Sequence, residues 1–300
     1  ATLVWGTSFI ILKETIEQVP AFFVIAVRFI IAGGILSLIF IKKLRAGSKK
    51  TFGKGVILGL FLFLAYVTQT LGLDNTTAGR NAFITGSYCV ICPFIIWILY
   101  KKKPTVKNIV SAILCIVGLA MVALSGDDGQ AKNQLLGDGL TFLGAIFFAF
   151  QIVYIDRFQK DGEDTVSMLC YELLTVGVLF ALLTLVFELP KGGIDGYSLN
   201  FDQIIRIGYL CLVCTLFAQF AQMFGQKYTS PNQTALILTL EAVFGVAFAM
   251  IIGDEKLTTT VGIGFVIIFV ALLVSELNFN FSAWKKKNKE NNQEKEEVAE

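Results

Sequence analysis

One carboxylate stands near the middle of an apolar stretch that is about long enough to cross a bilayer as a helix. The stretch runs from Ser230 to Thr258, and Glu241 lies in its segment LTLEAVF. A carboxylate at that depth costs about 2.5 to 3.5 kcal/mol even on a lenient insertion scale. Because such a group needs water, a partner or a proton, we expect Glu241 to face a polar cavity, where it contacts a substrate or carries a coupling proton.

Further polar side chains recur at helical spacing inside other apolar runs. Tyr66 and Gln69, Gln151 and Tyr154, and Gln219 and Gln222 are i, i+3 pairs, so each pair lies on one helix face. Either these groups share an aqueous cavity, or they join helices by hydrogen bonds within the membrane. The residues predicted to bind substrate are Trp5, Ser8, Gln69, Tyr88, Gln151, Tyr154, Gln219, Gln222 and Glu241.

Two more charged residues interrupt apolar segments. Arg28, within VIAVRFIIAGG, cannot be neutralised and must pair or extend its charge to the interface. A structural pair and a substrate contact are both open for it. Glu172 stands near the start of another apolar run, where either solvation by headgroups or a functional role would account for it.

The composition is that of a membrane protein. Of 300 residues 55% are hydrophobic and only 16% are charged, with a mean hydropathy of +0.70, whereas about a quarter of a soluble domain is charged. The chain has no His, and its six Cys fall inside apolar runs, where packing is their expected role. No catalytic dyad, metal cluster or nucleotide motif is visible. We therefore expect no enzyme activity, cofactor, metal or nucleic-acid partner.

The apolar runs predict an all-α polytopic protein with ten transmembrane helices. The first run is short for a span, which suggests that residues precede it. A charged tail at 278–300 is expected to be disordered. The ten predicted spans are 1–13, 21–41, 54–74, 78–100, 105–125, 138–156, 165–188, 204–225, 231–252 and 258–277.

Lys and Arg are distributed unequally between alternate loops. With both termini in the cytoplasm, the cytoplasmic segments carry eighteen Lys and Arg and the opposite loops carry five. Positive charge marks the cytoplasmic side of membrane proteins. The sequence thus predicts cytoplasmic termini in a multi-pass protein of the cell membrane.

An internal repeat relates the two halves of the chain. A shift of 153 residues lays Thr76–Thr105 on Thr229–Thr258 without a gap, and brings Tyr88 onto Glu241. The repeat predicts five spans in each unit, 1–125 and 138–277. An odd number of spans gives the two units opposite orientations, which is typical of secondary transporters with a binding site at the midplane.

Several of these segments resemble EamA-type members of the drug/metabolite transporter superfamily. They are WGTSFIILK (Trp5–Lys13), AVRF (Ala26–Phe29), AFITGSYCVICP (Ala82–Pro93), LTLEAVF (Leu238–Phe244) and GDEKLT (Gly253–Thr258). The resemblance implies two inverted five-helix repeats around a central cavity and transport of small metabolites, often amino acids. It marks Trp5, Lys13, Arg28 and Glu241 as positions of interest. Of these, we expect Lys13, Arg28 and Glu241 to form a charge pair or to take part in coupling.

Two positions depart from the family pattern. Ala242 stands where the family often has Pro after the glutamate, and Lys102 is the first-half counterpart of Glu255. A kink beside Glu241 and a symmetric pair of loop glutamates are therefore not expected.

We expect a secondary transporter of small polar metabolites that works by alternating access within the lipid bilayer. A channel or scramblase requires a continuous polar stripe through the bilayer, whereas the polar residues of this chain are clustered. A membrane-embedded enzyme requires a His, a catalytic dyad or a metal cluster, and the sequence shows none of these. The sequence is also compatible with a homodimer.

Overall fold

The computed structural model describes residues 1–123, 133–191, 199–252 and 258–276, and every regular element in these ranges is helical. The predicted tail and Glu255 lie outside the described residues. The α-helices are α1 Thr2–Ile16, α2 Ala21–Ile39, α3 Ile41–Ala46, α4 Lys49–Asn75, α5 Ala78–Thr85, α6 Tyr88–Tyr100, α7 Val106–Ala123, α8 Gln134–Lys160, α9 Thr165–Leu183, α10 Phe201–Tyr209, α11 Ala218–Gly225, α12 Pro231–Ile251 and α13 Thr259–Glu276. Two π-helical segments, η1 Thr184–Glu188 and η3 Leu210–Phe217, and two 3₁₀ turns, η2 Leu189–Lys191 and η4 Gln226–Tyr228, complete the list.

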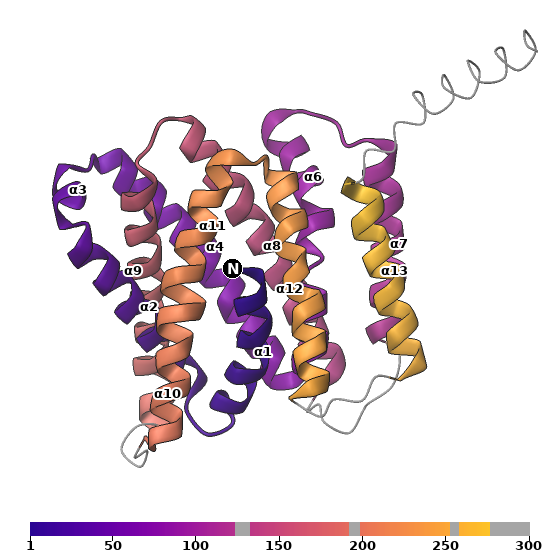
Figure 1. Ribbon diagram of the computed structural model, residues 1–300, viewed down its shortest axis with the longest axis horizontal. Coiled ribbons are helices and arrows are strands. Elements are labelled where there is room, and N and C mark those ends of the chain that lie inside the picture. Colours follow the sequence, from indigo (N-terminus) through magenta and orange to yellow (C-terminus); the bar gives the residue numbers. More distant parts are fainter. Residues whose placement is uncertain (124–132, 192–198, 253–257, 277–300) are drawn as a thin grey trace, which may run out of the picture.

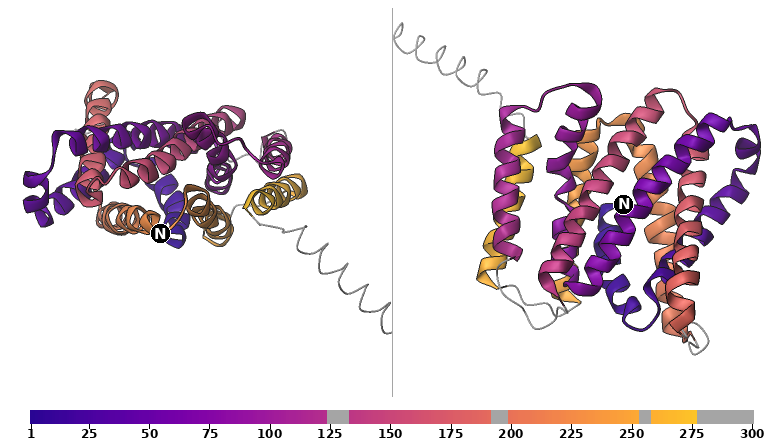
Figure 2. Two further views of the ribbon diagram at one scale, coloured as in Figure 1. Left: turned by 90° about the horizontal axis from the view of Figure 1, so that it is seen from above. Right: turned by 180° about the vertical axis from the view of Figure 1, so that it is seen from behind.

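The long helices stand side by side and run alternately up and down (Figure 1). Helix α1 lies inside the bundle, where it contacts α12, α5, η3 and α4. At one edge of the bundle α7 and α13 pack mainly on each other (Figure 2). α1 also contacts α2, α10 and α11, and side chains from seven helices line the space at the centre.

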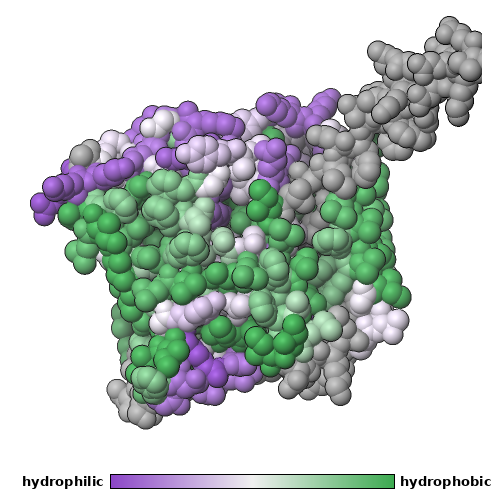
Figure 3. Space-filling view, viewed as in Figure 1, coloured by the Kyte–Doolittle hydropathy of each residue, from purple (hydrophilic) through white to green (hydrophobic). Residues whose placement is uncertain are grey.

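Seven helical segments of the described chain are long and apolar enough to cross a membrane. A broad apolar belt crosses the middle of the face seen in Figure 3, and hydrophilic residues gather along its upper and lower borders. α1 has 15 residues, and the described apolar parts of α7 and α13, Val106–Gly118 and Gly262–Ala271, are shorter than a full span. The molecule is therefore an all-helical, multi-pass membrane protein.

Side-chain caps fix where several helices begin. At the start of α12, the Ser230 hydroxyl accepts a hydrogen bond from the Gln233 amide N–H and the Gln233 side chain accepts one from the Ser230 N–H, with Pro231 in the first turn. Asn200 and Gln203 form the same reciprocal pair at α10. Such capping boxes satisfy amide groups that the helix leaves unbonded.

One predicted span is broken and its repeat counterpart is not. Gly86 and Ser87 separate α5 from α6, whereas α12 is continuous through Glu241 and Ala242. At the break, the Cys89 and Val90 amides bond three residues back rather than four. The absence of Pro at position 242 accords with the unbroken helix, because Pro would remove a hydrogen bond and clash with the preceding turn.

Glycines let helices approach closely at two places. A Cβ on Gly55 or Gly59 of α4 would lie 2.6 Å from a Cβ of α9, on Tyr171 or Thr175. On Gly245 of α12 it would lie 2.4 Å from the Ala82 Cβ of α5. Within a bilayer the hydrophobic effect does not hold helices together, so association depends on close van der Waals packing, which small residues allow.

A buried ion pair joins α5 to α8. The Arg80 guanidinium contacts the Asp138 carboxylate, and both side chains are buried. The Thr76 hydroxyl donates to Asp138 Oδ1 at 2.8 Å. Removing one partner of a buried pair is far more costly than replacing both.

We expect Asp138→Ala to lower the free energy of unfolding by about 3 to 5 kcal/mol, because it leaves the Arg80 charge buried without its carboxylate. The double variant Arg80→Met with Asp138→Leu should recover most of that loss. Denaturant or thermal unfolding in detergent measures both. A loss below about 1 kcal/mol in the single variant, the range of exposed ion pairs, would contradict the prediction.

A second ionic cluster ties the α8–α9 loop to the start of α4. Glu163 accepts a hydrogen bond from the Thr51 hydroxyl at 2.5 Å and pairs with the Lys54 ammonium at 3.1 Å, its side chain only 9% exposed. The hydrogen bond from Thr51 and the Lys54 charge hold the pKa of Glu163 below its usual range. Stability that depends on such a carboxylate is lost on acidification.

Glu163→Gln should therefore cost stability at neutral pH but not in acid. A carboxyl whose pKa is lower in the folded state stabilises the fold above its unfolded value of about 4.3, and the contribution disappears as pH falls through the folded value. We expect a difference of roughly one to two degrees in Tm at pH 7 that starts to shrink below about pH 4.3 and disappears once the pH has fallen through the lowered pKa of folded Glu163. Glu17→Gln in the exposed α1–α2 loop is the control. A difference that persists in acid would show that the carboxylate charge is not its cause.

Candidate functional site

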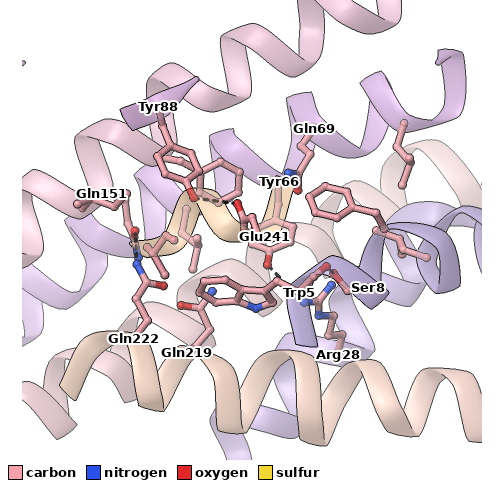
Figure 4. A pocket seen from close by; sticks show the side chains of 17 residues that line it. Trp5, Ser8, Arg28, Tyr66, Gln69, Tyr88, Gln151, Gln219, Gln222 and Glu241 are labelled. Atoms are coloured by element: carbon pink, nitrogen blue, oxygen red, sulfur yellow. Dashed lines mark hydrogen bonds between the residues drawn. The ribbon is translucent and has the colours of Figure 1, made fainter. Parts of the chain in front are cut away.

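A polar cavity lies at the centre of the bundle, between α1, α2, α4, α6, α8, α11 and α12 (Figure 4). Its volume is about 40 Å³, which is room for roughly three waters. Its polar lining residues are Trp5, Ser8, Arg28, Tyr66, Gln69, Tyr88, Gln151, Gln219, Gln222 and Glu241, and its apolar ones are Phe9, Leu12, Leu62, Leu73, Phe148, Ile152 and Leu238.

Glu241 and Tyr88 meet across this cavity. The Tyr88 hydroxyl of α6 donates to Glu241 Oε1 of α12 at 3.1 Å, and both side chains are buried. The break before α6 and the close approach of α12 to α5 at Gly245 bring the two helices together. The phenol gives the carboxyl a partner without neutralising its charge.

Arg28 reaches the same cavity from α2 and is 1% exposed. Its guanidinium donates to the Thr215 hydroxyl, and at 3.3 Å to the Tyr66 hydroxyl and to the Cys214 carbonyl. It also lies 5.3 Å from the centre of the Tyr66 ring. Within the described residues no carboxylate forms an ion pair with it, so neutral dipoles and an aromatic face stabilise the cation.

The π-helical segment η3 supplies the acceptors for Arg28. Within it the Thr215 hydroxyl donates to the Leu210 carbonyl five residues back at 2.8 Å, and the Cys214 carbonyl accepts the Trp5 indole N–H at 2.8 Å. Such wide turns are rare and often occur at functional sites. Apolar periodicity carries no signal for such turns, so η3 was not predicted from the sequence.

Four carboxamides line the cavity, and Gln151 and Gln222 lie on the side away from Arg28 (Figure 4). Gln222 Nε2 of α11 lies 3.4 Å from Gln151 Oε1 of α8, the two amides facing each other. Gln69 of α4 donates to the Thr85 hydroxyl at 2.9 Å. These amides can exchange their present partners for a polar ligand at little cost, because each retains both a donor and an acceptor.

Eight of the nine predicted substrate-binding residues line the cavity, and Tyr154 does not. The centre of the Tyr154 ring lies 5.1 Å from that of Phe61 and 5.4 Å from that of Phe158, which is one turn further along α8. Arg28 also lines the cavity. Lys13 lies outside it, where its ammonium donates to the carbonyls of Leu73 and Thr76 at the end of α4. A cation there complements the helix dipole.

The predicted substrate set omitted Tyr66, although its spacing to Gln69 had singled it out. Its ring lies between Arg28 and the Glu241 side of the cavity (Figure 4). The helical spacing was a sufficient signal for this residue. The apolar walls formed by Phe9, Leu12 and Phe148 gave no signal, because their residue types do not differ from those of the surrounding core.

Two other cavities occur in the described part of the chain. One, of about 320 Å³, lies between α6, α7 and α8 and has an almost wholly apolar lining. The other, of about 510 Å³, lies where the α8–α9 and α11–α12 loops meet. Only the central cavity combines a buried cation, a buried carboxylate and several amides. Among the described residues, no three His, Cys, Asp or Glu side chains come together as metal ligands.

Comparison with known proteins gives a consistent family. Residues 1–124 and 135–277 match the model of the EamA-like transporter family. An "Uncharacterized transporter" of Archaeoglobus fulgidus is 30% identical over 275 residues, which are 92% of this chain and 83% of that protein. A "Probable amino-acid metabolite efflux pump" of Escherichia coli is 21% identical, covering 95% of this chain and 94% of its own.

Two further matches agree with these. The "Uncharacterized inner membrane transporter YedA" of Escherichia coli is 23% identical over 94% of this chain and 90% of its own length. A crystal structure covers 92% of this chain and 96% of its own with a TM-score of 0.64 at 15% identity. At that identity the likeness concerns the fold alone.

Proposed function

The chain belongs to the EamA-like transporter family, and we propose that it is a secondary transporter of small zwitterionic metabolites, amino acids or related compounds, which works by alternating access. The observation that carries the proposal is that Arg28 and Glu241 line one small cavity. A guanidinium and a carboxylate in one buried site complement the two charges of an α-amino acid.

Each cavity group has a role in this recognition. Arg28 presents a planar fork that matches a carboxylate, and its present partners are neutral groups that a carboxylate would outcompete. Glu241 would accept the ammonium group, with Tyr88 as its neighbour. The amides of Gln69, Gln151, Gln219 and Gln222 and the edge of Trp5 would contact the rest of the solute, with Ser8 beside Trp5. Tyr154 and Lys13 would act through packing and closure.

The small size of the cavity supports alternating access. A volume of about 40 Å³ holds a few waters and no metabolite, so binding requires the walls to separate. Contacts also join helices beyond the cavity: Lys13 joins α1 to the end of α4, Gln226 of η4 donates to the Ile152 carbonyl of α8, and Gln159 of α8 donates to the Met223 carbonyl of α11. Opening one end while the other stays bonded would move the solute without a continuous pore.

Contacts between the halves support ten transmembrane helices in two inverted repeats, with units 1–125 and 138–277. Tyr88 and Glu241, 153 residues apart, bond to each other, as expected for equivalent residues beside a two-fold axis. A Cβ on Gly33 would contact Leu174, and one on Gly177 would contact Ile30. A shift of 144 residues exchanges these two contacts, which is the reciprocity of a two-fold interface.

The orientation follows from the positive loops. We place the α2–α4, α6–α7 and α8–α9 connections in the cytoplasm, with both termini, and the protein in the cell membrane. The relative YedA is named an inner membrane transporter, which agrees with that membrane. A homodimer is not needed for the cavity, because one chain supplies every lining residue.

Lys50→Cys and Glu17→Cys should react with a membrane-impermeant thiol reagent from opposite sides. The two positions are exposed and lie beyond opposite ends of α2, and the six native cysteines are buried. We expect Lys50→Cys to react only in inverted vesicles and Glu17→Cys only in intact cells. The reverse pattern would contradict the proposed orientation.

Glu241→Gln should abolish the dependence of transport on a pH gradient and weaken binding of the ammonium group by roughly thirtyfold, since losing a buried charged partner costs about 2 kcal/mol or more. The assay is uptake of a radiolabelled amino-acid mixture by proteoliposomes. Tyr88→Phe keeps the carboxylate and removes one hydrogen bond, so it should retain pH dependence. Wild-type pH dependence in Glu241→Gln would exclude proton coupling through Glu241, and ohmic conductance without counterflow would indicate a channel.

A further inference from the structure

A second carboxyl is buried behind the cavity wall. Glu172 of α9 is 0% exposed, which excludes solvation by headgroups. Its Oε1 accepts a hydrogen bond from Gln151 Nε2 at 2.8 Å. Its Oε2 is buried and has no hydrogen-bond partner. Glu172 does not line the central cavity, but Gln151 does.

The packing around Glu172 keeps water out. The α4 backbone lies against α9 on either side of it, where a Cβ on Gly55 would come within 2.9 Å of the Met168 carbonyl and one on Gly59 within 2.9 Å of the Glu172 carbonyl. α2 covers another face of α9 and α11 touches it as well. The carboxyl is therefore reached from the cavity only past Gln151.

Charged groups on the packed elements are engaged elsewhere. Arg28 of α2 bonds to Thr215 and Tyr66, and Glu172 forms no ion pair among the described residues. The charged residues of the other neighbours lie toward helix ends, and α11 has none. They are Lys42, Lys43 and Arg45 on α3, Lys49, Lys50, Lys54 and Asp74 on α4, and Asp138, Asp156, Arg157 and Lys160 on α8. η1, which also packs on α9, carries Glu188, whose carboxylate accepts hydrogen bonds from the Phe22 and Phe23 amides. The uncharged titratable groups on α9 and its neighbours include Cys170 and Tyr171 of α9, Tyr66 of α4 and Tyr154 of α8.

An ionised carboxylate in this position would have no water and no cation beside it, and only one of its two oxygens would accept a hydrogen bond. Such a charge is too costly to keep, so the group holds a proton instead. Glu172 needs water in order to ionise. The central cavity is a polar space close to it, and Gln151 lies between the cavity and the Glu172 carboxyl. Gln151 faces Gln222 with its oxygen and Glu172 with its nitrogen, so one amide joins the carboxyl to the substrate space.

We propose that Glu172 is a second proton-carrying carboxyl, and that Gln151 couples its proton to the occupancy of the cavity. This inference rests on the proposed transport function. When a solute takes the Gln151 amide as its partner, the amide leaves Glu172 and cavity water reaches the carboxyl. The proton passes to that water and Glu172 becomes a carboxylate. When the solute leaves and Gln151 returns, a proton from water restores the neutral acid.

The position of Glu172 within the two halves agrees with this role. Arg28 is the eighth residue of α2 and Glu172 the eighth residue of α9, related by the same 144-residue shift that exchanges the Gly33 and Gly177 contacts. One half thus brings a fixed cation to the cavity. The other half brings, at the equivalent position, an acid that can lose its charge.

Infrared spectroscopy of the purified full chain tests the proton directly, without any ligand. At neutral pH we expect a carboxylic-acid C=O band that shifts in D₂O and is lost in Glu172→Gln. Glu163→Gln removes a loop carboxylate that pairs with Lys54, so it is the control and should leave that band in place. Gln151→Leu should move the band to higher wavenumber, because the C=O group loses its hydrogen-bond donor. It also tests the assignment if Glu172→Gln does not fold.

Transport of the radiolabelled amino-acid mixture tests the coupling. Glu172→Gln should lower accumulation driven by a pH gradient more than it lowers counterflow exchange. An acid band unchanged in Glu172→Gln, or unaffected by Gln151→Leu, would overturn the proposal, as would wild-type accumulation in Glu172→Gln. If the wild type transports nothing while the band behaves as expected, the proposed function fails and the protonated Glu172 stands.

Discussion

A polar group that leaves water inside this bundle is costly unless it finds a partner there, and that constraint organises the structure. Backbone groups satisfy it by forming helices alone throughout the described residues. Side chains satisfy it by pairing across helices: Arg80 with Asp138, Tyr88 with Glu241, Gln151 with Glu172. Because the first two of these pairs join elements far apart in sequence, the polar contacts help to determine which helices meet at the centre, while small residues determine how closely they approach.

The same requirement explains the irregular backbone at the cavity. Arg28 carries a charge that cannot be removed, and the described neighbours supply no carboxylate for it. The wide turns of η3 compensate, because the Cys214 carbonyl is turned toward Trp5 and Arg28 while Thr215 bonds five residues back. The break between α5 and α6 similarly allows Tyr88 to approach Glu241. Deviations from regular helix thus occur where charge is buried.

The sequence predicted the helices well because membrane helices follow from apolar length alone. The starts of α2, α9 and α12 agree with the predicted spans to the residue. Helical spacing also brought together most of the polar side chains, and it marked Tyr66 as well as Gln69. Spacing does not account for Tyr154, whose ring packs against Phe61 and Phe158 instead of lining the cavity. It gives no information on closure by Lys13 or on π-helical turns, since these depend on tertiary partners.

Glu172 shows most clearly what a single sequence leaves open. Its place near the start of an apolar run allowed solvation by headgroups, and only the packing of α4 and α2 against α9 shows that it is dry. In the repeat that we propose, the two halves would place different side chains at equivalent positions: Arg28 and Tyr88 in the first, Glu172 and Glu241 in the second. A symmetric scaffold with identical groups would have two equivalent ends and no means of distinguishing a solute's ammonium from its carboxylate. In the transporter that we propose, an asymmetric set of side chains on that scaffold would give the solute one orientation, and would confine proton exchange to the half that carries Glu172 and Glu241.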